Sequence, residues 1–368
     1  MPLGPADLDL VRGLVEIPSV SRDEGEAVEW LVARMRERGF RASVDDAGNA
    51  VGEGGQVGQV GQGTVHVVLL GHIDTVPGEI PVRIESGVLV GRGAVDAKGP
   101  LAAFVAAATD AVPGVRVTVV GAVEEESPTS AGARYRALHP APDWCVVGEP
   151  SGWDAITVAY KGRLVLDVAL SRPARHGAAP GPTVSEEALR LWERVRAAAE
   201  AHGGQRAQGG RPRAFDRLDC RLEGMWSGDG DGLAERARLR IGYRIPPGLV
   251  PDAVETEVVA VVAEHDGEAG VEVARVAAEE PARTSRTSPL ARAFVGAIAE
   301  AGGEASFTVK SGTSDMNVLA RSWACPMVAY GPGDSAYDHT PMERLALDDY
   351  ARAIAVIRGV LRRAMPPP

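Results

Sequence analysis

The chain has 368 residues, roughly twice the length of one ordinary domain of ~100–200 residues, so its length predicts two domains. A net charge of -11 argues against a protein that holds nucleic acid through bulk positive charge. No apolar run approaches the ~20 residues that cross a bilayer, and the N-terminus MPLGPADLDL is not that of a signal peptide, so we expect no membrane association and a cytoplasmic protein.

The N-terminal segment has a helical pattern. Ser21 and Glu24 match an S-x-x-E capping box, an amphipathic run follows as far as Arg38, and Gly39 stands where a helix-ending glycine is expected. Residues 52–63, GEGGQVGQVGQG, are of low complexity and predict a flexible loop between strands. This end of the chain predicts packing and no chemistry.

Strand-like and helical segments alternate from Thr64 onward. The predicted strands of this pattern are 64–70, 115–123, 144–148 and 325–330, and its predicted helices include 100–111 and 287–301. Such alternation is typical of an α/β fold with a mixed, largely parallel sheet that is flanked by helices.

The middle of the chain has a different order of elements. Its predicted elements are strands at 163–170, 217–225, 235–244 and 271–278 and helices at 184–201 and 251–264. This βαββαβ order predicts an inserted α+β, ferredoxin-like domain. We place it at residues 162–284, between residues 1–161 and 285–368 of the first domain, and expect the arginine-rich stretch 203–213 to be an exposed loop.

Polar clusters follow the apolar strands of the first domain. They are Gly71-His72-Ile73-Asp74, Glu124-Glu125-Glu126, Gly148-Glu149-Pro150 and Asp338-His339, and Asp96 in GRGAVDAKG precedes a helix. Because open α/β sheets place their sites at the carboxyl ends of strands, we expect these clusters to converge. The three cysteines are widely spaced and form no CxxC, so the available ligands are histidines and carboxylates, a set that suits zinc or a similar divalent ion.

The same segments resemble a known enzyme family. GHIDTVPG, GRGAVDAKG, EEESPTSAGAR, VGEPS, GTSD and DHTP are similar, in this order, to motifs of the two-zinc family of acetylornithine deacetylase, succinyl-diaminopimelate desuccinylase and glutamate carboxypeptidase. VKSGTSDMNVLA with GPGDSAYDHTP most resembles its lysine-biosynthesis branch. Hydrolases of that branch release lysine or ornithine from the C-terminal γ-glutamyl amide of an amino-group carrier protein, and some are acetyl-lysine deacetylases.

The resemblance implies two Zn²⁺ per subunit, for which Co²⁺ can substitute. It implies one ion held by His72, Asp96 and Glu149 and a second held by Asp96, Glu126 and His339. Three protein ligands per ion would leave room for a shared water, as catalytic zinc sites require.

The register of the acidic triplet decides which glutamate acts on that water. Family members have a glycine about six residues after the ligand, and Gly132 is six residues after Glu126, which makes Glu125 the general base. Asp74, two residues after His72, is expected to hydrogen-bond the second ring nitrogen of that histidine.

The inserted domain resembles the family's lid and dimerisation domain, which implies a homodimer. His176 would stabilise the oxyanion across the dimer, and Arg244 would bind a substrate carboxylate. Gly312 and Thr313 would line the pocket for the amino-acid product. The asparagine motif usually found upstream of the arginine is replaced here by DGDGLAERA.

Several functions remain compatible with these residues. The leading hypothesis, hydrolysis of an amide of lysine or ornithine, allows two kinds of substrate. A small acidic carrier protein would dock on the basic segment with Arg206, Arg211, Arg213 and Arg217. With a small N-acyl amino acid as substrate, that segment would be a solvated loop. A dipeptidase or carboxypeptidase would share the metal site. A metal-binding regulatory or scaffold protein would differ by losing a ligand or the base, and every such position is filled here.

Overall fold

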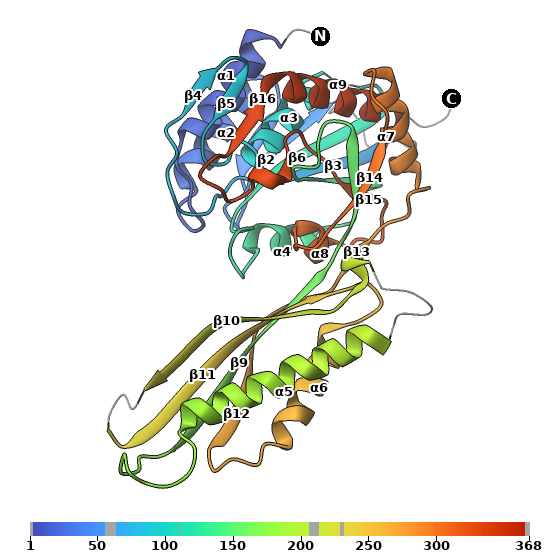
Figure 1. Cartoon of the computed structure of the whole chain (residues 1–368). Coiled ribbons are helices and arrows are strands. Elements are labelled where there is room, and N and C mark those ends of the chain that lie inside the picture. Colours follow the sequence, from blue (N-terminus) through green and yellow to red (C-terminus); the bar gives the residue numbers. More distant parts are fainter. Residues whose placement is uncertain (1–2, 56–63, 111, 206–212, 229–231, 365–368) are drawn as a thin grey trace. The chain divides into compact units, whose positions relative to one another are not determined.

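The chain forms two compact units. The computed structural model describes residues 3–55, 64–110, 112–205, 213–228 and 232–364 (Figure 1). The first unit comprises Met1–Ala159, Thr284–Val309 and Ser314–Pro368, and the second comprises Tyr160–Arg283 and Lys310–Thr313. The second unit is therefore an insertion into the chain of the first.

A mixed sheet forms the centre of the first unit. Its strands are β1 (Arg41–Val44), β2 (Ala50–Gly55), β3 (Val65–His72), β6 (Val115–Ala122), β7 (Trp144–Gly148), β8 (Ala155–Tyr160), β14 (Ser306–Lys310) and β15 (Met327–Ala329). The order is β1-β2-β6-β3-β7-β15-β8, and β14 also pairs with β8. Strands β6, β3, β7 and β15 are parallel, whereas β1, β2 and β8 pair antiparallel with their neighbours. The predicted mixed, largely parallel α/β sheet is confirmed.

Helices cover this sheet, and a small sheet of β16 (Arg344–Ala346), β5 (Val88–Val90) and β4 (Arg83–Glu85) lies beside it. The helices are α1 (Pro5–Glu16), α2 (Gly25–Glu37), α3 (Lys98–Ala108), α4 (Ala131–Ala137), α7 (Pro289–Glu300), α8 (Asp315–Leu319) and α9 (Leu347–Arg363). Every residue of α3 is buried, because its sequence KGPLAAFVAAA is almost wholly apolar and it packs against β3, α1 and α9. Helix α9 instead buries one stripe, with Tyr350, Ile354, Ile357 and Leu361 at helical spacing.

The second unit has one antiparallel sheet and two long helices. Its elements are β9 (Gly162–Pro173), α5 (Val184–Gln205), η1 (Ala214–Asp216), β10 (Asp219–Gly228), β11 (Ala234–Ile245), α6 (Pro251–Ala263), β12 (Gly270–Glu279) and β13 (Ala282–Arg283). The sheet order is β10-β11-β9-β12. Leu164, Leu166, Val168 and Leu170 alternate along β9 and are buried beneath α5 and α6. This is the predicted βαββαβ order; the unit's expected role as a lid and dimerisation domain stays a prediction.

The predicted capping box before α2 is wrong. Glu24 occupies the N-cap position with helical backbone angles and makes no side-chain cap. The Ser21 hydroxyl donates to Asp74 Oδ2 at 2.7 Å, and the Glu24 carboxylate accepts from the Glu124 N–H at 3.1 Å. Both side chains are therefore used by distant strand ends. The helix-ending role of Gly39 is confirmed by its φ of 87°.

Two predicted loops overlap regular structure at their ends. Residues 52–55 belong to β2, because they pair with β6, while 56–63 lie outside the described residues. Helix α5 continues to Gln205, and 206–212, with Arg206 and Arg211, also lie outside them. Among the residues that the structure describes, no helix is both long and apolar enough to span a membrane.

Candidate metal centre

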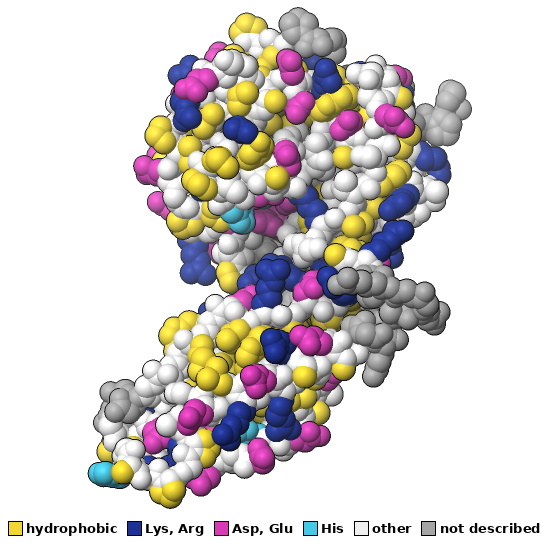
Figure 2. Space-filling view, in the orientation of Figure 1, with side chains coloured by type: hydrophobic (Ala, Val, Ile, Leu, Met, Phe, Trp, Pro, Cys, Tyr) yellow, Lys and Arg dark blue, Asp and Glu magenta, His cyan; other side chains and the backbone are white. Residues whose placement is uncertain are grey.

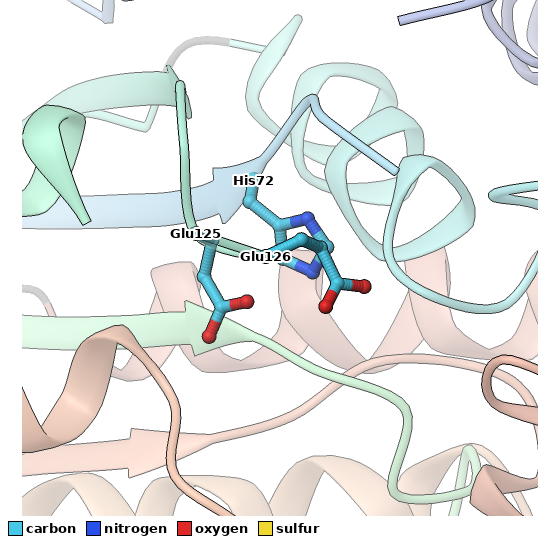
Figure 3. A group of neighbouring side chains, drawn as sticks. All are labelled: His72, Glu125 and Glu126. Atoms are coloured by element: carbon cyan, nitrogen blue, oxygen red, sulfur yellow. The ribbon is translucent and has the colours of Figure 1, made fainter. Parts of the chain in front are cut away.

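The parallel strands bring the polar clusters to one edge of the first unit. His72 is the last residue of β3, and the glutamate triplet begins two residues after the end of β6, the neighbouring strand. Two groups of possible ligands result, and in each the ligand atoms lie within 4.8 Å of one another. The first is His72 with Glu125 and Glu126 (Figure 3). The second is Asp96 with Glu126 and His339. Histidine and acidic side chains also meet on the visible surface of this unit (Figure 2).

The Asp96 carboxylate lies between two imidazole rings. Its Oδ1 is 3.2 Å from Nε2 of His72, and its Oδ2 is 3.0 Å from Nε2 of His339. Nε2 of His339 is also 2.7 Å from Oε1 of Glu126. One carboxylate that faces two nitrogen donors through its two oxygens has the arrangement of a bridging ligand, as the motif resemblance implies for Asp96.

His72 is oriented by the backbone. Its Nδ1 lies 3.0 Å from the carbonyl oxygen of Asp74 and 3.5 Å from the carboxylate of the same residue. Because a carbonyl oxygen can only accept, Nδ1 carries a proton, and Nε2 is the ring nitrogen that faces Asp96. The same nitrogen also pairs with the Asp74 carboxylate, as expected, and this interaction raises the pKa of His72 against the effect of burial and lowers that of Asp74.

The carboxylate of Asp74 also positions the acidic triplet. Its two oxygens accept the backbone N–H groups of Glu125 and Glu126 at 3.1 and 3.0 Å, in addition to the Ser21 hydroxyl. Asp74 is fully buried, so these donors replace the water that a carboxylate would otherwise need. It therefore fixes the positions from which both glutamate side chains start.

The charges of the cluster favour a bound cation. Hydrogen bonds to Asp96 and then Glu126 raise the pKa of His339 to about 10. Burial alone would raise the pKa of Asp96, but hydrogen bonds from His339 and His72 lower it below its usual range. The donors present are imidazole nitrogens and carboxylate oxygens, so the site fits divalent metal ions of the kind that accept N and O ligands.

Glu125 has the environment of a proton-transfer group. Burial, followed by the negative charges of Glu149, Asp315 and Glu126, raises its pKa well above the ordinary value, while His72 opposes the shift. A carboxyl group that readily holds a proton can shuttle one between water and a leaving group. Among the described residues, Glu149 is in neither ligand group, although it is buried and its charge acts on Glu125.

The four remaining predicted site residues, His176, Arg244, Gly312 and Thr313, lie in the second unit. His176 is exposed, and its Nδ1 accepts the Ala178 N–H at 3.2 Å. Arg244 is half-buried, and its Nη1 has no hydrogen-bond partner within the part of the chain that the structure describes. Gly312 is exposed and Thr313 half-buried. Their roles in binding substrate stay predictions.

Glu343 is a supporting residue that the sequence reasoning missed. Its buried carboxylate accepts the backbone N–H groups of Val95 and Asp96 at 3.0 and 3.1 Å, and Arg92 donates to it at 2.7 Å. It therefore holds the backbone of the bridging aspartate. The sequence signal that could have identified Glu343 is its position four residues after the predicted ligand His339, in DHTPMER.

Replacing Asp74 by asparagine should loosen the metal centre without removing a ligand. The amide offers one acceptor oxygen, and its NH₂ group would face one of the two backbone N–H donors of Glu125 and Glu126. We expect metal affinity, measured by calorimetric titration, to fall about 10–100-fold. Asp143→Asn is the control, because that carboxylate accepts the His66 N–H at 2.7 Å where β3 begins. Equal affinity in Asp74→Asn and wild type would contradict this role.

The chain is similar to proteins of one family over almost its whole length. The model of peptidase family M20/M25/M40 matches residues 68–363. A relative named LysW-lysine hydrolase, from Deinococcus radiodurans, is 44% identical and 98% of each chain is covered. One named LysW-lysine/LysW-ornithine hydrolase, from Saccharolobus islandicus, is 27% identical over 93% of this chain and 91% of its own. The solved structure of the YXEP protein of Bacillus subtilis, described as a dinuclear metal-binding peptidase of family M20, is also similar. It superposes with a TM-score of 0.70 at 12% identity, and the match covers 98% of this chain and 97% of the YXEP chain.

Proposed function

The chain belongs to peptidase family M20/M25/M40, and on this basis we propose that it is a metal-dependent hydrolase that releases lysine or ornithine from the γ-glutamyl amide at the C-terminus of an amino-group carrier protein. One observation of the site carries the reaction type. The Asp96 carboxylate lies between His72 and His339, and the half-buried Glu125 lies in the same cluster. The similarity to the LysW-lysine hydrolase favours the substrate, which would place the enzyme in lysine or arginine biosynthesis in the cytoplasm.

The proposed cofactor is a pair of Zn²⁺ ions, for which Co²⁺ can substitute. His72, Asp96 and Glu149 would hold one, and Asp96, Glu126 and His339 the other. Two divalent ions at such a site lower the pKa of water and polarise an amide carbonyl. Glu125 accepts the proton that the attacking water loses, and it then donates that proton to the nitrogen of the leaving amine. Water and amide thus become a carboxylic acid and an amine.

Residues of the second unit complete the proposed reaction. The Nε2–H of His176 would donate to the oxyanion, and Arg244 would bind the substrate carboxylate through its two parallel donors. Gly312 and Thr313 would contact the amino-acid product. The unit would also form a homodimer, as it does in the family that the motifs resemble.

The size of the substrate can be tested directly. Binding energy from the carrier, remote from the amide, should raise kcat/KM at least about tenfold above that for N-acetyl-lysine or N-acetyl-ornithine. The assay follows amine release from carrier-linked lysine, carrier-linked ornithine, both acetyl compounds, succinyl-diaminopimelate and a dipeptide. A higher kcat/KM on an acetyl or succinyl compound would favour the small-molecule deacylase, and one on the dipeptide the peptidase.

A separate pair of substitutions tests whether an acidic carrier docks on the second unit. Arg213 is exposed and Arg217 half-buried at the two ends of η1. Reversing both charges should raise KM for the carrier substrate about 10-fold and leave hydrolysis of acetyl-lysine unchanged. Arg12→Glu with Arg292→Glu, two exposed positions of the first unit, is the matched control. An unchanged rate with the carrier would contradict docking at these arginines.

A further inference from the structure

Residues 174–183 of the second unit, here termed the His176 loop, connect β9 to α5. The Ala178 N–H donates to Nδ1 of His176 at 3.2 Å, and the Ala179 N–H donates to its carbonyl oxygen at 2.7 Å. Because Nδ1 is an acceptor here, a neutral ring must carry its proton on Nε2. The loop therefore presents His176 as an N–H donor.

The loop has almost no apolar anchorage of its own. Its exposed residues are Ala174, His176, Gly177, Ala178, Pro180, Gly181 and Thr183. Ordering such a segment costs conformational entropy, which burial of its side chains does not offset here. Its conformation must therefore be held by polar contacts from outside.

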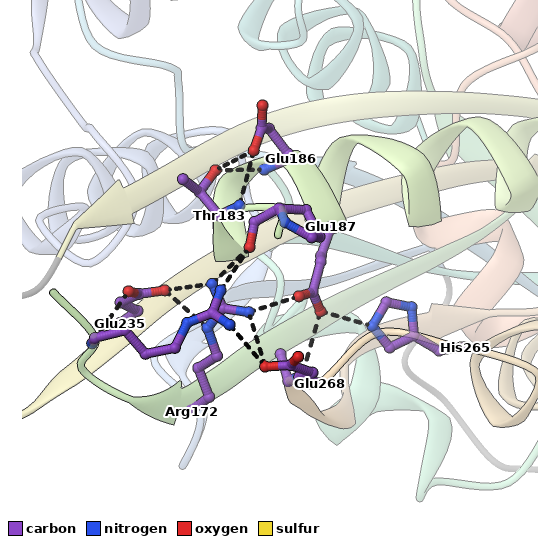
Figure 4. A network of polar contacts seen from close by, with 10 residues as sticks. Arg172, Thr183, Glu186, Glu187, Glu235, His265 and Glu268 are labelled. Atoms are coloured by element: carbon purple, nitrogen blue, oxygen red, sulfur yellow. Dashed lines mark hydrogen bonds and ion pairs between the residues drawn. The ribbon is translucent and has the colours of Figure 1, made fainter. Parts of the chain in front are cut away.

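Arg172, at the end of β9, supplies such contacts (Figure 4). Its buried guanidinium donates to the Pro182 carbonyl at 2.7 Å, to Glu187 at 2.8 Å and to Glu235 at 2.8 Å. Arg175 donates to the same Pro182 carbonyl at 2.9 Å and to Glu268 at 2.8 Å. Two arginines at the N-terminal end of the loop thus donate hydrogen bonds to one carbonyl at its C-terminal end.

Glu187 connects Arg172 to the rest of the unit. It is buried at the start of α5, and its second carboxylate oxygen accepts from the Ala269 N–H at 3.2 Å and lies 3.1 Å from Nε2 of His265. A buried ionic network is a weak source of stability compared with apolar packing, but it restricts geometry strongly. Its position favours a role in setting the conformation of the loop.

We propose that Arg172 and Arg175 are positioning residues that hold the His176 loop so that Nε2–H of His176 points to an anionic oxygen of the substrate. The inference rests on the proposed function, which identifies that oxygen as the one that develops on the hydrolysed amide. Neither arginine touches substrate, because each acts through the loop.

Hydrogen exchange of the full-length protein tests the positioning independently of activity. Arg175→Met should raise exchange of the peptide that covers the His176 loop about 10-fold and leave the rest of the unit unchanged. Arg172→Lys, which keeps the charge but cannot reach three acceptors at once, should do the same. The matched control is Arg240→Lys, which breaks a pair with Asp167 at 2.8 and 2.9 Å in the same sheet. Wild-type exchange of the loop in both variants would overturn the inference.

Kinetics test whether the arginines act through His176. His176→Ala should lower kcat about 100-fold, the usual loss for one oxyanion donor. Arg175→Met should lower kcat about 10-fold with KM within about twofold, and it should cause no further loss in the His176→Ala background. A further 10-fold loss in the double variant would overturn the inference. Full activity of His176→Ala would instead overturn the role of His176 in the proposed function, whatever the exchange data show.

Discussion

Glu125→Gln is expected to lower kcat about 10³-fold while the protein still binds two metal ions. Glutamine has the size of the half-buried glutamate, but its amide cannot accept and return a proton at neutral pH. The raised pKa of Glu125, caused by burial and by the charges of Glu149, Asp315 and Glu126, shows that its surroundings let it hold a proton. The measurement is kcat on carrier-linked lysine, together with the metal content after desalting.

The neighbouring glutamate supplies the matched control for this variant. Glu124 carries the same carboxylate, but it pairs with Arg22 at 3.6 Å, accepts from the Thr129 hydroxyl, and is in neither ligand group among the described residues. Glu124→Gln should keep kcat within about twofold of wild type. Full activity of Glu125→Gln would show that the base is misassigned. Loss of one ion from that variant would show instead that Glu125 is a ligand, as its place beside His72 and Glu126 permits.

The convergence of the site could be predicted because it follows from the direction of the strands. Parallel strands β3, β6 and β7 end at the same edge, so residues that follow their apolar runs must meet there. This argument needs no knowledge of side-chain conformation. The strand directions predict that His72 and the glutamate triplet lie together, and the order of the motifs along the chain predicts that Asp96 joins them.

Contacts that join distant parts of the chain could not be predicted in this way. The sequence around Ser21 fits a local helix cap, yet the hydroxyl donates to a carboxylate 53 residues away. Glu343 binds backbone groups of Asp96, 247 residues before it, and no local pattern distinguishes it from a solvated glutamate. Local propensity competes with tertiary contacts of this kind, and at a buried site the tertiary contact prevails because unpaired polar groups are costly there.

Asp96→Asn should remove both ions and lower kcat/KM more than about 10³-fold. Asparagine keeps one carbonyl oxygen toward one histidine, but its NH₂ group, which has no lone pair to offer a metal ion, must then face Nε2 of the other. The side chain is only 11% exposed, so water cannot easily replace the lost ligand. Asp45→Asn is the control, because Asp45 is 13% exposed in the same unit and accepts the backbone N–H groups of Ala47 and Asn49.

The number of ions lost by Asp96→Asn decides between a bridging and a single-ion ligand. A bridging carboxylate contributes to both ions, so metal content after desalting should fall from two ions per chain to below one. A ligand of one ion would leave the other in place, which would contradict the bridging geometry seen between His72 and His339. Stability supplies a second measurement, since each ion at 100 times its Kd stabilises the folded chain by about 2.7 kcal/mol. Added Zn²⁺ should therefore raise the Tm of wild type and of Asp45→Asn but leave that of Asp96→Asn nearly unchanged.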